Sequence, residues 1–200
     1  MKTKFMLALL GVVLLMSCNQ KVKDVEVTDQ KELSTAQQQE YLVLGDSISA
    51  RAQQVLLSNV AEQMKLGGPV GALDFCNEKA MFLTDSVSDE FSKKIQRLTD
   101  KTRNPDNAIV NDIDQKAWDN IKGLMADANA GKHLILSDES DVYYYKAIPI
   151  GMPTCLMCHG SKETDIAPAT LEAIAKKYPN DQATGYAMGE LRGMWKIKMN

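Results

Sequence analysis

Residues 155–159 read Cys155-Leu156-Met157-Cys158-His159, a Cys-x-x-Cys-His motif. This pattern is typical of a c-type haem attachment site, in which both thiols bond to the porphyrin and the histidine binds iron. Two intervening residues bring the sulfurs to one edge of the macrocycle, and the next residue projects toward the metal. We therefore expect the domain to be organised around one covalent haem c held by Cys155, Cys158 and His159.

Two other interpretations of the motif are open. A Cys-x-x-Cys pair also occurs in thioredoxin-like dithiols and as half of a zinc site. Zinc is disfavoured because only Cys76 and His133 remain as further ligands, and they do not form a second pair with finger-like spacing. A thioredoxin-like pair is disfavoured because Cys155 lies late in the chain, not after the first strand of a βαβ unit.

The N-terminus has the pattern of an export signal. Residues 1–4 are basic, and residues 5–16 form an uncharged apolar run that is too short for a transmembrane helix. The run ends in Leu-Met-Ser-Cys at residues 15–18, which resembles the lipobox of bacterial lipoproteins. We predict a signal peptide over residues 1–17 and a lipid on Cys18, which would anchor a periplasmic or cell-surface protein to a membrane. The alternative is an ordinary secretory cleavage that leaves Cys18 as a free thiol.

The composition suits one folded domain with short appendages. The chain has 200 residues and a formal net charge of -3. It therefore lacks the excess of basic residues that would predict a nucleic-acid partner. Residues 18–38 are polar without a sustained apolar period and predict a flexible tether. The folded domain is expected over residues 39–200, with a membrane and an unidentified redox protein as its partners.

Hydrophobic periodicity predicts two long helices at the start of this domain. Apolar residues recur in steps of three and four from residue 39 to residue 65, and Gly67-Gly68-Pro69 predicts the end of that helix. A second helix is predicted over residues 70–83 with Cys76 on its inner stripe. Of the four cysteines, Cys76 is left over once Cys18, Cys155 and Cys158 are assigned. It is then either a metal ligand or a small buried hydrophobe.

The rest of the chain mixes strands with shorter helices, which predicts an α+β fold. Two strands at 133–136 and 142–150 flank an acidic turn and predict an antiparallel hairpin. A helix capped by Asp112 or Asp114 is expected to run to Ala130 and to end at Gly131. The remaining predictions are strands at 94–99 and 194–199 and a helix at 168–177.

Several motifs spread along the chain resemble those of one known family. They are Cys76, Arg97, Arg103-Asn104-Pro105, Asn107, residues 155–160, Tyr178 to Tyr186, Gly189 and Arg192-Gly193. Taken together, they resemble the Tll0287-like family over about residues 40–200. The resemblance implies a PAS-like antiparallel sheet with long N-terminal helices and a c-type haem.

The same resemblance implies a ligand set for the iron. His159 and Cys76 are the implied axial ligands, and His133 remains the alternative to Cys76 because histidine is the better generic haem ligand. Arg97 and Arg103 are the implied partners of the haem propionates, since a guanidinium can bind a carboxylate with two parallel hydrogen bonds. The alternative for both arginines is solvated surface charge.

A thiolate opposite an imidazole would favour ferric iron and fill both axial positions. Such a site suits outer-sphere electron transfer or redox response, which is the expected function. A gas or redox sensor that signals through a partner protein is the second hypothesis, and a haem peroxidase is the third. We do not expect an enzyme, because turnover of oxygen or peroxide would need one ligand to leave.

Overall fold

The computed structural model describes residues 32–200. The predicted signal peptide over residues 1–17, the lipidation site Cys18 and the tether up to residue 31 lie outside the described residues, so these features stay predictions. Within the described part, no helix is both long enough and apolar enough to cross a membrane.

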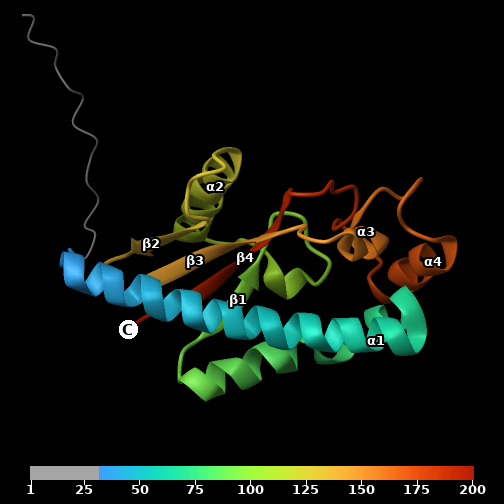
Figure 1. Cartoon of the computed structure of the whole chain (residues 1–200), viewed down its shortest axis with the longest axis horizontal. Coiled ribbons are helices and arrows are strands. Elements are labelled where there is room, and N and C mark those ends of the chain that lie inside the picture. Colours follow the sequence, from blue (N-terminus) through green and yellow to red (C-terminus); the bar gives the residue numbers. More distant parts are fainter. Residues whose placement is uncertain (1–31) are drawn as a thin grey trace, which may run out of the picture.

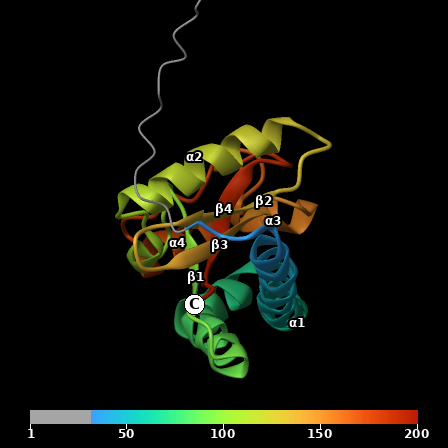
Figure 2. The same ribbon diagram turned by 90° about the vertical axis from the view of Figure 1, so that its left-hand side faces the viewer.

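A four-stranded antiparallel sheet forms the middle layer, in the order β1-β4-β3-β2. Its strands are β1 (Ile95–Leu98), β2 (His133–Ser137), β3 (Val142–Pro149) and β4 (Leu191–Lys198). The predicted hairpin is confirmed as the β2–β3 pair, in which His133 faces Lys146. Helix α2 (Asp112–Ala126) covers one face of the sheet and helix α1 (Thr35–Phe91) the other (Figure 2). The predicted α+β fold with an antiparallel sheet is therefore confirmed.

Helix α1 (Thr35–Phe91) turns back on itself where the sequence predicted a break. Gly68 has φ +63° and ψ −162° inside the helix, a conformation that favours glycine, and the ribbon doubles back there (Figure 1). We call residues 35–67 the first arm and residues 69–91 the second arm. The first arm begins at Thr35 within the predicted tether, behind a capping box between Ser34 and Gln37. The second arm continues to Phe91, so the predicted end at Leu83 was wrong.

The smaller helices are α2 (Asp112–Ala126), α3 (Pro153–His159) and α4 (Pro168–Lys177), with a 3-10 turn at Pro105–Asn107. The N-cap of α2 is Asn111, whose side-chain oxygen accepts from the backbone N–H of Asp114. The predicted caps Asp112 and Asp114 were therefore wrong, because both lie inside the helix. The predicted end at Ala130 was also wrong, since Asp127 already ends the helix.

Strand alternation divides the core between the two faces of the sheet. Tyr144 and Trp195 point toward α1 and pack with Ile48, whereas Tyr145 and Met194 point toward α2 and pack with its buried residues. Gly45 of α1 lies directly over Tyr144, because a Cβ at this glycine would sit 2.3 Å from the tyrosine ring. The sheet is thus clamped between α1 and α2, while α3 and α4 lie beyond its end (Figure 1).

Candidate functional site

The Cys-x-x-Cys-His motif forms the short helix α3, directly after β3. Pro153 occupies the first turn, where a missing backbone N–H is tolerated. Cys155 and Cys158 are three residues apart, so they lie on the same face of the helix. Both thiols are free and half-buried. The structure therefore presents the two sulfurs together, as covalent attachment to one edge of a macrocycle requires.

His159 ends α3 and is half-buried. Its Nδ1 lies 2.8 Å from the carbonyl oxygen of Ala183. We assign the proton to Nδ1, because only a donor forms a favourable contact with that oxygen, and this leaves the lone pair of Nε2 for a metal. Burial, with the positive charges of Arg192 and Arg103, holds the pKa of His159 well below its usual value. The imidazole is therefore neutral, which is the form that binds metals.

Cys76 comes from the second arm of α1 and faces the same site as α3. Burial raises the pKa of the Cys76 thiol, and the positive charges of Arg97 and Arg103 partly offset this effect. Burial also raises the pKa of Cys158, and the nearby charge of Cys76 adds to the increase. Helices α1 and α3 are in contact. The fold thus places the Cys76 thiol near the Cys-x-x-Cys-His motif.

Arg103 ties the end of α3 to the loop that supports His159. Its Nη2 donates to the carbonyl oxygen of Cys158 at 2.7 Å and to that of Ala183 at 3.4 Å. The guanidinium also forms a two-pronged ion pair with Asp181, with Nε 2.9 Å and Nη2 3.2 Å from the carboxylate oxygens. Both side chains of this pair are less than one-tenth exposed. The edge of Arg103 that best fits a carboxylate is therefore already occupied by Asp181.

Arg97 lies on β1, near Cys76. Its Nε is buried and has no hydrogen-bond partner among the described residues, and its Nη2 lies 4.0 Å from the sulfur of Met81. Burial lowers the pKa of Arg97, whereas nearby charge on Cys76 and Tyr178 raises it. A buried donor without a partner is costly, so the site has capacity for an anionic or accepting group beside Arg97.

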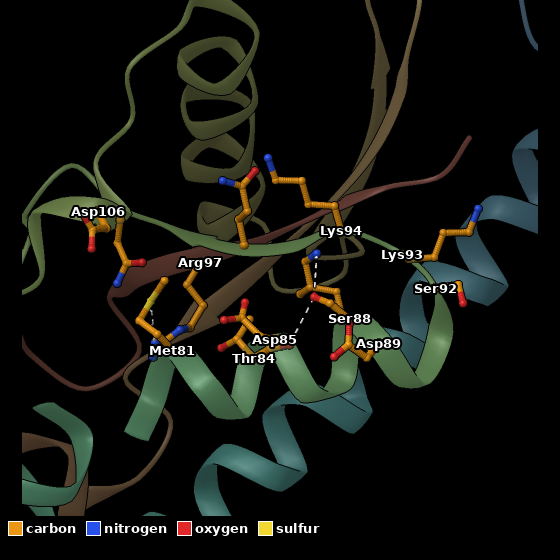
Figure 3. A pocket seen from close by; sticks show the side chains of 13 residues that line it. Met81, Thr84, Asp85, Ser88, Asp89, Ser92, Lys93, Lys94, Arg97 and Asp106 are labelled. Carbon is orange, nitrogen blue, oxygen red and sulfur yellow. Dashed lines mark hydrogen bonds between the residues drawn. The ribbon is translucent and has the colours of Figure 1, made fainter. Parts of the chain in front are cut away.

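A cavity of about 540 Å³ lies next to this site, between β1 and the second arm of α1. Arg97 and Met81 stand at one end of it (Figure 3). In its lining, the hydroxyl oxygen of Ser88 accepts a hydrogen bond from the backbone N–H of Ile95. Its lining is rich in charge, including Asp85 and Lys93. The charged side chains in this lining do not suit an apolar macrocycle, and Arg97, which lies near Cys76, belongs both to the lining and to the candidate site.

The sequence of residues 20–200 matches the family described as Tll0287-like. This chain belongs to the Tll0287-like family. Its fold is also similar to the crystal structure of the cyanobacterial haem protein Tll0287, with 21% sequence identity and a TM-score of 0.61, over 80% of this chain and 94% of that chain. A search of curated proteins gave no match. The family resemblance drawn from the motifs is therefore confirmed, and so is the fold that it implied.

In this Tll0287-like chain, His133 lies away from the motif. Its Nδ1 is 3.1 Å from a carboxylate oxygen of Asp46, and its ring packs at a tilt on Tyr144, with 5.8 Å between centroids. In the sheet, His133 pairs with Lys146 of β3, whereas α3 follows the end of that strand. Of the two predicted partners for His159, the fold favours Cys76.

Sequence reasoning did not assign a role to two residues beside the motif, one in contact with His159 and the other in contact with Arg103. Asp181 pairs with Arg103, and Arg192 on β4 places its Nε 3.3 Å from Nδ1 of His159. Both belong to the motifs that carried the resemblance to the Tll0287-like family. The only signal in the sequence was their place in those motifs, because nothing in their spacing shows which residue they touch.

Proposed function

We propose that this chain is an exported, lipid-anchored protein that carries one covalent haem c and acts in electron transfer or redox response. Cys155 and Cys158 would form the two thioether bonds, each thiol adding across one vinyl group. His159 and Cys76 would supply the two protein ligands of the iron. The observation that carries the proposal is the convergence of Cys76, from the long helix α1, on the three residues of α3.

The charges around the motif support an anionic cofactor. Arg97, Arg103 and Arg192 surround it, and among the described residues Asp181 is the carboxylate in direct contact with them. A buried excess of positive charge is unfavourable unless it is compensated. Haem propionates and a Cys76 thiolate would supply that compensation. The unpartnered Nε of Arg97 makes it the better propionate partner. For Arg103 this role stays a prediction, since Asp181 occupies its Nε and Nη2.

The protein side of the site suits electron transfer. A bound haem would supply one-electron chemistry at iron. The hydrogen bond from His159 Nδ1 to Ala183 fixes the imidazole plane and the tautomer, as such partners do for metal-bound histidines. Arg103 holds the carbonyl oxygens of Cys158 and Ala183 together. These contacts limit movement of the ligand between oxidation states, which favours outer-sphere transfer over turnover of a small substrate.

The location of the protein is part of the same proposal. Haem c attachment takes place after export, which agrees with the leader predicted over residues 1–17. A lipid on Cys18 would keep the domain at a membrane surface, with a redox protein as its partner. Acyl chains anchor firmly when two or more are present.

Covalent attachment is the step to test first. We would produce the full chain in a host that assembles c-type cytochromes, then record its intact mass and its pyridine haemochrome spectrum. The proposal expects the mass of one added haem and a spectrum of haem with both vinyl groups saturated. A Cys155→Ser, Cys158→Ser double variant should lose both signals. A wild-type protein that folds and is exported without added haem would refute the proposal.

A further inference from the structure

Arg192 lies behind the imidazole of His159, on the side of the ring away from Nε2. Its Nε is 3.3 Å from His159 Nδ1, and its Nη1 donates to Thr99 Oγ1 at 3.2 Å and to the carbonyl oxygen of Lys101 at 3.3 Å. Its guanidinium also lies over the ring of Tyr186, 5.6 Å from the centroid. These contacts hold the charge of Arg192 in one place.

The partners of Arg192 are neutral groups. No carboxylate in residues 32–200 lies within ion-pair distance of its guanidinium, in contrast to Arg103 with Asp181. A buried charge without an ionic partner costs stability. The contacts with Thr99, Lys101 and Tyr186 offset only part of that cost, because they are hydrogen bonds to neutral oxygens and one cation–π contact.

Two neighbours compete for the same nitrogen of His159. Nδ1 cannot donate to the carbonyl oxygen of Ala183 and also accept from Arg192, because it carries either a proton or a lone pair. The shorter contact, 2.8 Å to Ala183, assigns the proton to Nδ1. Arg192 then acts on the imidazole through its charge. The carbonyl oxygen increases electron density on the ring, and the guanidinium draws it away.

We propose that Arg192 is a positioning residue that sets the reduction potential of the haem by holding a positive charge against the proximal imidazole. This inference rests on the proposed function. A fixed positive charge near iron opposes the ferric state, whereas a thiolate from Cys76 favours it. Arg192 therefore raises the potential of a site that the thiolate would otherwise hold low. Arg192 acts from the Nδ1 side of the His159 ring. A propionate partner such as Arg97 does not lie there.

The test is a potentiometric titration of the full-length, haem-loaded protein. Arg192→Gln removes the charge, and the ratio of ferrous to ferric protein at a fixed ambient potential is expected to fall about tenfold, or about 59 mV for a one-electron couple. Arg192→Lys should recover part of this shift because it keeps a charge. Arg51→Gln is the matched control, since it removes an arginine from an exposed pair with Glu90 and should leave the potential unchanged.

Haem content and the ferric EPR spectrum are measured on the same samples. They separate the two proposals, because a wild type without haem refutes the proposed function itself. A loaded, low-spin Arg192→Gln protein with the wild-type potential overturns the role of Arg192. If Arg192→Gln takes up no haem, Arg192→Lys carries the test, since it keeps a charge but loses the contact of Nη1 with Thr99 that fixes this charge beside the imidazole. A lower potential supports the inference, and an unchanged one contradicts it.

Discussion

Arg103 binds the carbonyl oxygen of Cys158 at 2.7 Å, across 55 residues of sequence. This hydrogen bond satisfies one of the last carbonyl groups of α3, which has no partner within the helix. The same guanidinium is fixed by Asp181. The shape of the Cys-x-x-Cys-His motif therefore depends on an ion pair outside the motif.

Breaking that buried ion pair should destabilise the fold. Asp181→Asn leaves the charge of Arg103 buried without a partner, which typically costs about 3–5 kcal/mol. We expect a loss of that size in the free energy of unfolding, measured by urea denaturation. Glu90→Gln is the control, because its partner Arg51 is exposed and such surface pairs contribute about 0–1 kcal/mol. Equal losses in the two variants would mean that the pair is not structurally important.

The close approach of α1 to the sheet requires glycine at position 45. A Cβ there would lie 2.3 Å from the ring of Tyr144, so Gly45→Ala must displace the ring or the helix. Overpacking of this kind costs about 1–3 kcal/mol. A Cβ added at Gly123 in α2 meets no atom within 4 Å, so Gly123→Ala should stabilise the fold by about 0.5–1 kcal/mol. Thermal unfolding of both variants tests this contrast, and a neutral Gly45→Ala would contradict the packing described.

Asp46 should make stability depend on acid pH. Burial alone would raise its pKa, but hydrogen bonds from Lys146, Tyr144 and His133 lower it from 3.8 to about 2. A carboxyl with a lowered folded-state pKa contributes stability above its unfolded pKa and loses it as the pH falls. As the pH is lowered from about 4 to about 2, we therefore expect the urea midpoint of the wild type to decrease more steeply than that of Asp46→Asn. Parallel profiles would show that Asp46 contributes nothing.

The proposed lipid anchor depends on one side chain. Cys18→Ser removes the thiol that would be acylated, so the variant should move from the membrane fraction to the soluble fraction after cell lysis. Detergent should release the wild type, whereas a salt wash should not, because the attachment is hydrophobic. Retention of Cys18→Ser on the membrane would exclude lipidation as the means of attachment.

Hydrophobic periodicity was sufficient to predict most helices and strands, because the spacing of apolar residues within each segment determines its apolar face. The break at Gly68 and the hairpin of β2 and β3 are examples. Element ends were less predictable. The second arm extends to Phe91 because Val87 packs on the sheet, and β4 begins at Leu191 because it pairs with Pro149. Both contacts join segments that are distant in sequence.

The candidate site was likewise predictable from the sequence only in part. Cys155, Cys158 and His159 were predicted as haem-binding residues from the motif alone, and Cys76 from the family resemblance; these roles stay predictions. The contacts of Arg192 and Asp181 could not be predicted, because each depends on how β4 or a loop packs behind α3. His133 remained open from sequence, and in the structure its side chain contacts Asp46 of α1 and Tyr144 of β3.

The most direct test of the central claim is the ferric absorption and EPR spectrum of the haem-loaded wild type, Cys76→Ser and His133→Ala. With Cys76 and His159 as axial ligands, the wild type is low-spin, Cys76→Ser changes the spectrum and raises the reduction potential, and His133→Ala matches the wild type. A Cys76→Ser protein with the wild-type spectrum and potential would contradict the account.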